Sequence, residues 1–135
     1  MLKSGCIHPG VMSVLSKLGH GDKILIADGN YPLMQRTGDA EKVYLGLTAG
    51  TPTVTEVLNT LLHEINVEAA CVMDPCEEDE PEIFEEFRQM LPGICLSKLS
   101  RYEFYDAASE SAVGLAISTG ETRVFANILI TVGVA

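Results

Sequence analysis

Apolar positions recur along this chain at two spacings, which predict an alternation of helices and strands. Apolar residues three and four positions apart are typical of one face of a helix, and short continuous apolar runs are typical of buried strands. The expected helices cover 9–18, 53–65, 80–91 and 101–109, and the expected strands cover 23–27, 43–47, 68–73, 94–96, 112–118 and 127–132.

Residues that begin and end helices support these assignments. Pro9 suits a first helical position, and Gly19 follows the last apolar position of the same segment. The sequence Thr53-Val54-Thr55-Glu56 is a capping box, in which the first and fourth residues satisfy each other's backbone N–H groups. Pro92-Gly93 is a stop signal for the third helix.

The order of the elements predicts a layered α/β fold, with a mainly parallel sheet and helices on both faces. The chain has 135 residues, which suits a single domain over residues 1–135. In sheets of this kind, ligands bind beyond the carboxyl ends of the strands. Side chains that directly follow a predicted strand are therefore the first candidates for a site.

The charge and composition exclude several kinds of partner. A formal net charge of −10 argues against a nucleic acid or an anionic membrane surface, because both require a basic surface. There is no leader-like segment and no apolar stretch of transmembrane length, so we expect a cytoplasmic protein. The four cysteines form no C-x-x-C pair, and no metal or other cofactor is expected. An apolar content of 47% suits subunit interfaces as well as a core.

The strand at 23–27 is flanked by the two most distinctive polar residues, His20 before it and Asp28 after it. Histidine titrates near neutral pH and is equipped for proton transfer. Because the two residues fall at opposite ends of one strand, a direct pair within one subunit is not expected, and a site across a subunit interface would bring them together. Two other interpretations remain: His20 stabilises the end of the first helix, and Asp28-Gly29-Asn30 is only a turn.

Three groups of residues, in order along nearly the whole chain, resemble the ribose pyranase and fucose mutarotase family of bacteria. They are Gly19–Asp22 with Ile26–Pro32, Arg101–Tyr105, and Thr119–Glu121 with Phe125–Ile130 and Gly133-Val134. The resemblance implies an isomerase that interconverts the anomers or ring forms of a free monosaccharide without a cofactor or metal. It also implies a ring-shaped homo-oligomer, commonly a decamer, with sites near subunit interfaces.

The resemblance also implies a role for individual residues. His20 would be the acid–base residue, Asp28 and Asn127 would bind sugar hydroxyls, and Phe125 and Ala126 would form a wall beside them.

Arg101 would supply fixed guanidinium donors to the sugar, and its alternative role is an ion pair with one of the many carboxylates. Phe125 lacks a phenolic hydroxyl that the family usually has, and Tyr105, Tyr31 or Tyr102 is a candidate to replace it.

The resemblance points to two substrates. Arg101 and Gly19-His20-Gly21-Asp22 are closer to the fucose branch, whereas Phe125-Ala126-Asn127 is closer to the ribose branch. L-Fucose is the predicted substrate, and D-ribose is the alternative. Two further hypotheses are a sugar-binding accessory protein that does no chemistry, and a structural or regulatory ring with no sugar site.

Overall fold

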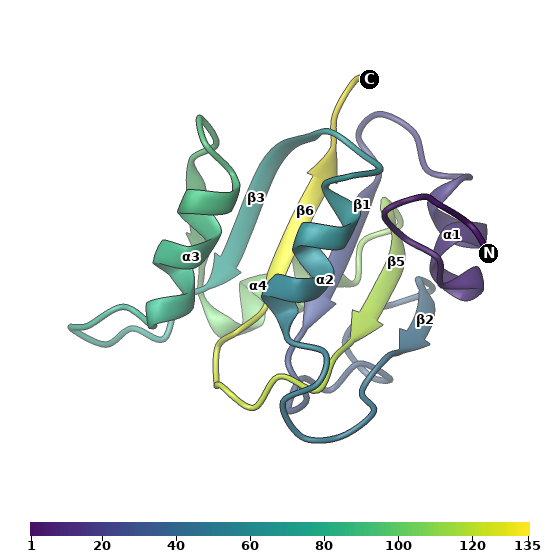
Figure 1. The fold of residues 1–135 in the computed structure, drawn as a ribbon. Coiled ribbons are helices and arrows are strands. Elements are labelled where there is room, and N and C mark those ends of the chain that lie inside the picture. The colour runs from purple at the N-terminus through teal and green to yellow at the C-terminus, as the bar shows by residue number, and fades with distance from the viewer.

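The computed structural model describes all 135 residues and contains one six-stranded sheet with four helices (Figure 1). The strands are β1 (Lys23–Ala27), β2 (Glu41–Tyr44), β3 (Val67–Met73), β4 (Leu96–Leu99), β5 (Val113–Ser118) and β6 (Ile128–Val132). The helices are α1 (Pro9–Leu15), α2 (Val54–Leu61), α3 (Glu82–Met90) and α4 (Arg101–Ala108). The strand order across the sheet is β2-β5-β1-β6-β3-β4.

The direction of β6 decides which loops meet. β1 and β2 run parallel to β5, and β3 runs parallel to β4. β6 lies between β1 and β3 and runs antiparallel to both. The other five strands therefore point the same way, and the residues that precede β6 lie at the edge where those five strands end.

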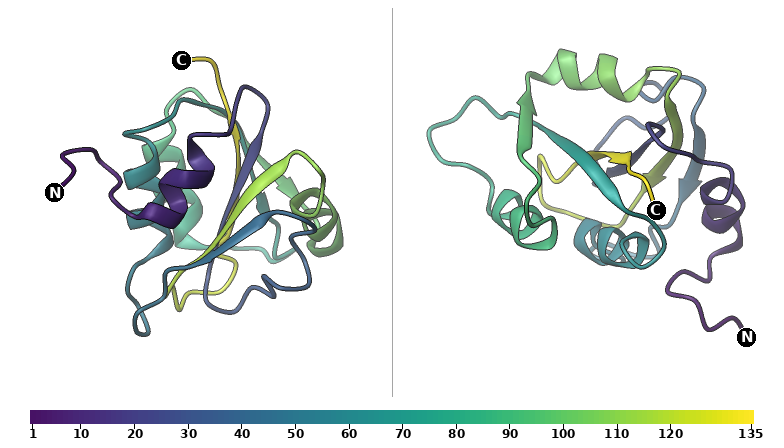
Figure 2. Two further views of the ribbon diagram at one scale, coloured as in Figure 1. Left: turned by 90° about the vertical axis from the view of Figure 1, so that its right-hand side faces the viewer. Right: turned by 90° about the horizontal axis from the view of Figure 1, so that it is seen from above.

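Helices cover both faces of the sheet, as the sequence predicted. α1, α2 and α3 lie on one face, and α4 lies on the other (Figure 2). Side chains of β1 alternate between the two cores, because successive residues of a strand point to opposite faces. Ile24 and Ile26 pack with α1, α2 and α3, whereas Leu25 and Ala27 pack with Phe104 of α4.

The two outermost strands differ from the prediction. β2 covers Glu41–Tyr44 rather than 43–47, and β4 covers Leu96–Leu99 rather than 94–96. Both are edge strands with polar side chains, such as Glu41 and Lys98, in exposed or half-buried positions. Because an edge strand has a partner on one side only, a search for apolar runs misplaces its ends.

The first two helices are shorter than predicted. After Leu15, the amides of Lys17 and Leu18 bond to carbonyls three residues back, so α1 tightens into a turn instead of continuing. α2 ends in the same way, since the amides of His63 and Glu64 bond three residues back. The apolar periodicity persists through such turns, which explains the longer prediction.

The capping box that begins α2 provides a test of local stability. Thr53 Oγ1 accepts from the Glu56 amide at 3.2 Å, and the Thr53 amide donates to Glu56 Oε2 at 2.8 Å. We expect Thr53→Ala to lower the free energy of unfolding by about 1 kcal/mol, because the Glu56 amide loses its acceptor. Thr53→Ser keeps the hydroxyl and should change it far less. Urea denaturation of both variants checks this, and equal stabilities would contradict it.

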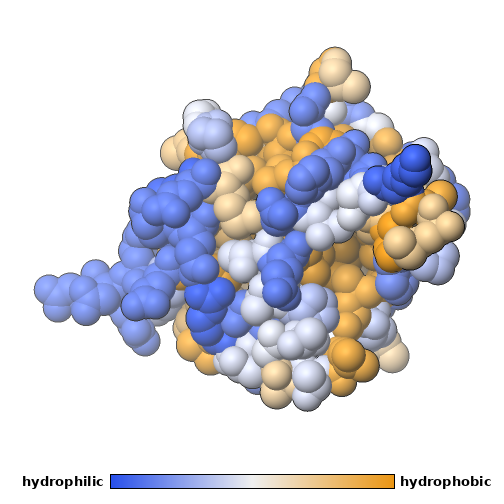
Figure 3. Space-filling view, in the orientation of Figure 1, coloured by the Kyte–Doolittle hydropathy of each residue, from blue (hydrophilic) through white to orange (hydrophobic).

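The surface combines an acidic arm with apolar grooves. Hydrophobic atoms are exposed around α2 and beside the C-terminal segment, whereas the loop between β3 and α3 projects as a hydrophilic arm (Figure 3). One groove, of about 500 Å³, is lined by Leu18, Ile65, Val134 and His20 among others. None of the helices has the length and apolar character needed to cross a membrane.

Candidate functional site

A pocket of about 210 Å³ lies at the edge of the sheet where β1 ends and β6 begins. Five of the residues predicted for the site line it, namely Asp28, Arg101, Tyr105, Phe125 and Asn127. Asn30, Tyr31, Pro32, Met73 and Val124 complete the lining. Ala126 is fully buried, and its amide bonds to Asp28 directly beside the pocket.

Asp28 forms hydrogen bonds to the loop after β1 and to the loop before β6, at the base of this pocket. Its side chain is buried, and its two carboxylate oxygens accept from the Asn30 amide at 2.9 Å and the Ala126 amide at 3.2 Å. Burial raises the pKa of Asp28 above its ordinary value, although hydrogen bonds from the Asn30 and Ala126 amides oppose the rise. A carboxylate fixed in this way presents oriented acceptors to a hydroxylated ligand. The interpretation of this segment as only a turn is therefore too narrow.

Asn127 is oriented by the backbone of the same strand end. Its Oδ1 accepts from the Asp28 amide at 2.8 Å, so its Nδ2 is left free as a donor. No buried side-chain nitrogen or oxygen in the chain is without a partner, which means that this Nδ2 reaches the pocket surface. Asp28 and Asn127 thus offer an acceptor and a donor side by side, and they meet because β6 is reversed.

α4 supplies the opposite wall of the pocket. Ser100 and Glu103 form a capping box that begins the helix at Arg101. Arg101 and Tyr105 are four residues apart and therefore share one helix face. The Arg101 guanidinium carbon lies 5.7 Å from the centre of the Phe125 ring. Arg101 makes no ion pair in the chain, so the ion-pair interpretation is wrong and its donors remain available.

Phe125 has a left-handed backbone, with a φ angle of 57°. A large side chain rarely adopts this conformation, and such exceptions often occur at functional sites. Phe125 has no hydroxyl, and three tyrosines were the candidates to supply one. The hydroxyl of Tyr31 donates to the Arg36 carbonyl at 2.9 Å, and Tyr102 is exposed outside the pocket lining. Tyr105 lines the pocket, and its hydroxyl has no hydrogen-bond partner in the chain.

His20 lies at the other end of β1, away from this pocket. The five residues of β1 span about 17 Å at ~3.3 Å per residue, and His20 lies in the turn that precedes this strand. His20 lines the groove beside the C-terminal segment, where its Nε2 lies 2.8 Å from Glu68 Oε2. The first helix is capped at Ser16 and has no basic residue in its last turn, and the polar partner of the His20 ring is Glu68.

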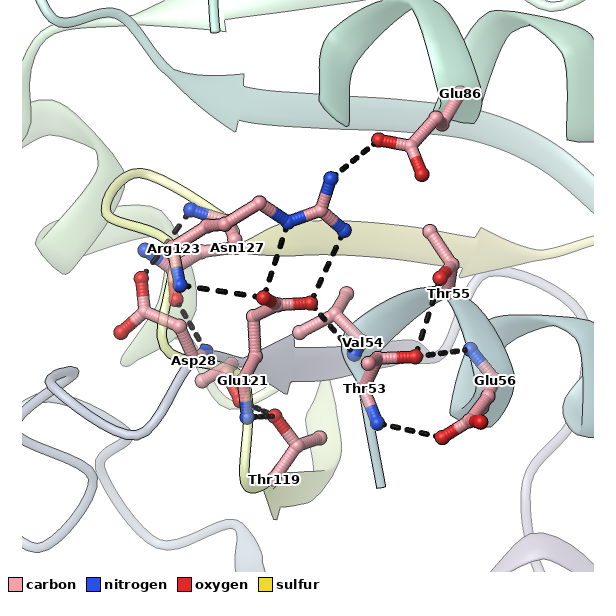
Figure 4. Close-up of polar contacts among 12 residues, drawn as sticks. Asp28, Thr53, Val54, Thr55, Glu56, Glu86, Thr119, Glu121, Arg123 and Asn127 are labelled. Carbon is pink, nitrogen blue, oxygen red and sulfur yellow. Dashed lines mark hydrogen bonds and ion pairs between the residues drawn. The ribbon is translucent and has the colours of Figure 1, made fainter. Parts of the chain in front are cut away.

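The sequence did not reveal an ionic cluster near Asp28 and Asn127, in which Glu121 is buried and Arg123 and Glu86 are partly exposed (Figure 4). Glu121 accepts from Arg123 Nε at 3.0 Å and from the Val54 amide at 3.4 Å, and Arg123 also pairs with Glu86 of α3. Glu121 and Arg123 together therefore join the loop before β6 to α2 and α3. The only sequence signal was a carboxylate two residues before an arginine, which is too common to interpret alone.

This cluster predicts how stability depends on pH. Burial opposes ionisation of Glu121, but the bonds from Arg123 outweigh it and lower the pKa of Glu121. A lowered pKa stabilises the fold above the unfolded-state pKa, and the contribution disappears as the pH falls through the folded-state value. Burial raises the pKa of Asp28, so this residue has the opposite effect on stability. Its ionised form costs stability, and that cost disappears as the pH falls.

We expect Glu121→Gln to be less stable than wild type at neutral pH and to lose less stability on acidification. Urea denaturation from about pH 7 to about pH 3 measures how the free energy of unfolding of each protein changes with pH. Parallel loss of stability in the two proteins would contradict the assigned role of Glu121.

The polar residues of the pocket suit a small, uncharged, hydroxylated ligand. They combine a carboxylate, an amide and a guanidinium with aromatic walls. No three His, Cys, Asp or Glu side chains in the chain gather closely enough to hold a metal ion, and all four cysteines are unpaired.

Known proteins resemble this chain over its whole length. A family profile described as the RbsD / FucU transport protein family matches residues 1–135. A D-ribose pyranase of Staphylococcus haemolyticus is 33% identical over 134 residues, covering 99% of this chain and 98% of the relative. A D-ribose pyranase of Cronobacter sakazakii is 30% identical, with 99% of both chains covered.

Solved structures from both branches share the fold. The structure of Bacillus subtilis RbsD complexed with D-ribose has a TM-score of 0.87 and 27% identity, covering 100% of this chain and 99% of that one. The fucose mutarotase from Streptococcus pneumoniae, in complex with L-fucose, has a TM-score of 0.83 and 26% identity, with the same coverage.

Proposed function

The chain belongs to the RbsD / FucU family, which includes ribose pyranase and fucose mutarotase isomerases, and we propose that it interconverts the ring forms of a free monosaccharide. The observation that carries the proposal is the pairing of Asp28 and Asn127, an oriented acceptor and donor, in a pocket that also contains Arg101.

We propose D-ribose as the first substrate and L-fucose as the second. The named relatives at about 30% identity are ribose pyranases, which favours the alternative over the fucose preference of the sequence motifs. Solved relatives were bound to each sugar, and their TM-scores to this chain are similar.

The proposed reaction transfers protons and needs no redox step. A base takes the proton of the anomeric hydroxyl, an acid delivers a proton to the ring oxygen, and the bond between the anomeric carbon and the ring oxygen breaks. After rotation of the open aldehyde, a hydroxyl of the same sugar attacks it and both transfers reverse. A different hydroxyl gives a different ring size, and the opposite face gives the other anomer.

Each residue of the pocket has a defined part in this proposal. Asp28 accepts from sugar hydroxyls, Asn127 and Arg101 donate to them, and Tyr105 supplies the hydroxyl that Phe125 lacks. Phe125 and Ala126 close the wall beside the ring.

His20 performs the proton transfers, and it comes from a second copy of the chain. One chain keeps His20 and Asp28 at opposite ends of β1, so a complete site requires another subunit. The groove around His20 is lined by Leu15, Leu18 and Ile65, the kind of apolar surface that subunit interfaces cover. A closed ring of identical subunits provides that interface at every site.

Saturation-transfer NMR on free sugars tests the proposed function. With ribose, fucose and galactose as the panel, we expect the protein to speed exchange between ring forms at least about tenfold over buffer for ribose. We expect fucose to show the second-largest acceleration. No acceleration for any of the three sugars would overturn the proposal.

One observation favours a second candidate, a sugar-binding accessory protein. A single chain has the polar groups that bind a sugar, whereas His20, the residue assigned to the proton transfers, lies in another groove. This candidate predicts ribose binding by calorimetry with uncatalysed exchange in the same NMR samples.

A further inference from the structure

Arg123 lies in the middle of the loop that leads into β6, between two carboxylates. These are Glu121 of the same loop and Glu86 of α3 (Figure 4). Its Nε donates to Glu121 Oε1 at 3.0 Å, one terminal nitrogen donates to Glu121 Oε2 at 3.2 Å, and the other donates to Glu86. Its backbone amide also donates to Glu121 Oε1, at 3.2 Å. The polar contacts of Arg123 therefore hold this loop to itself and to α3.

Other contacts fix the two ends of the loop but not its middle. At the end near β5, the Gly29 amide donates to the Glu121 carbonyl at 2.9 Å. At the end near β6, the Ala126 amide donates to Asp28 at 3.2 Å. Between these two points, the only hydrogen bonds of residues 122–125 are those of Arg123. Arg123 is therefore what fixes the middle of the loop.

The two residues after Arg123 form part of the wall of the sugar pocket. Val124 and Phe125 line the pocket, whereas Arg123 lies outside the lining. Phe125 has a left-handed backbone, which a large side chain keeps only where the surrounding structure imposes it. The Arg101 guanidinium packs over the Phe125 ring. The position of the loop therefore sets both the aromatic wall and the place of the Arg101 donors.

We propose that Arg123 is a positioning residue for sugar binding, which holds Val124 and Phe125 in place by connecting their loop to α3. This proposal rests on the proposed function. Arg123 contacts no substrate and acts through the wall of the pocket. Without its contacts, residues 122–125 must become ordered when the sugar binds, and that ordering costs affinity.

The alternative is a purely structural role, in which Arg123 only neutralises Glu121. The side chain of Glu121 is 4% exposed, so the loss of its cation destabilises the fold in either case. A loss of stability therefore does not separate the two roles. The division of the kinetic effect between KM and kcat does, and so does the region in which amide hydrogen exchange becomes faster.

The kinetic test compares Arg123→Gln and Arg123→Lys with a matched control, Arg88→Gln. Arg88 of α3 pairs with Glu80 at 2.9 Å but lies outside the pocket lining. For Arg123→Gln we expect a KM for ribose roughly 5-fold to 20-fold higher, with kcat within about twofold of wild type. Lysine keeps the charge without the forked contacts, so Arg123→Lys should have an intermediate KM. The control should keep the wild-type KM.

Glu86→Ala removes the connection to α3 alone, and it decides the question if Arg123→Gln fails to fold. The side chains of Arg123 and Glu86 are 39% and 42% exposed, so the loss of this pair should leave stability nearly unchanged. We expect KM to rise about 2-fold to 5-fold, because the middle of the loop is less ordered before the sugar binds.

Amide hydrogen exchange of Glu86→Ala gives a readout that does not depend on activity. We expect the Ala126 amide to exchange at least about threefold faster, while the amides of β5 in the sheet interior keep their rates. Equal changes in both regions, or no change in either, would overturn the positioning role.

The kinetic outcomes separate this proposal from the proposed function. If wild type is active but Arg123→Gln and Glu86→Ala have the KM of Arg88→Gln, the positioning role is overturned while the proposed function stands. If wild type does not speed the interconversion of ring forms, the proposed function fails and the role of Arg123 in sugar binding fails with it.

Discussion

Replacement of His20 by alanine is expected to abolish catalysed exchange while leaving the fold and the sugar pocket intact. General acid–base groups contribute about 10²–10⁴-fold to such proton transfers, and the loss should be of that size. The side chain of His20 is exposed, and its only polar contact is with Glu68, so stability should change by no more than about 0.5 kcal/mol. Saturation-transfer NMR measures the rate, and calorimetry measures the remaining sugar binding.

His8→Asn is the matched control for this variant. His8 caps α1, accepting from the Val11 amide at 3.2 Å, and asparagine is also a good cap. The control removes an imidazole but should keep both the helix and the activity. Full activity in His20→Ala would contradict the assignment of His20 as the acid–base residue.

Replacement of Asp28 is expected to weaken sugar binding more than any other change in the pocket. Asp28→Asn keeps the shape but removes the charge and one acceptor, and we expect a KM roughly 10-fold to 100-fold higher, since hydrogen bonds to charged groups are worth about 1.5–3 kcal/mol. Asp28→Ala also leaves the buried amide of Ala126 without its acceptor. That variant should lose about 1–3 kcal/mol of stability as well.

Asp106→Asn tests whether a charge change alone explains these effects. Asp106 is an exposed carboxylate on α4, outside the pocket lining. Its replacement should leave both KM and the free energy of unfolding unchanged. If Asp28→Asn binds the sugar as tightly as this control, Asp28 does not contact the substrate.

The sequence predicted the elements in the interior better than those at the edges of the sheet. β1 was placed correctly because its apolar run is buried on both faces, whereas β2 and β4 were shifted because polar side chains interrupt their patterns. α2 and α4 both begin at capping boxes; the one at Thr53 was recognised in the sequence, whereas α4 was expected from residue 101 without it.

The site was only partly predictable, because some of its contacts depend on topology. The extended strand predicted the separation of His20 from Asp28, and the structure agrees. The contact between Asp28 and Asn127 depends on the reversal of β6, which the alternation of helices and strands did not indicate. The pair of Glu68 with His20 was missed for the same reason, because the sheet brings together residues that are 48 positions apart. Glu121 and Arg123 are only two residues apart, and that spacing is too common to interpret alone.

The proposed site contains His20 of one subunit and Asp28 of another, and mixing the two inactive variants tests this most directly. His20→Ala and Asp28→Asn should each be nearly inactive alone at a low ribose concentration. Equal amounts co-assembled in one ring should recover about a quarter of the wild-type exchange rate, because random neighbours rebuild that share of complete sites. Mixed rings with no recovered activity would contradict a site shared between subunits.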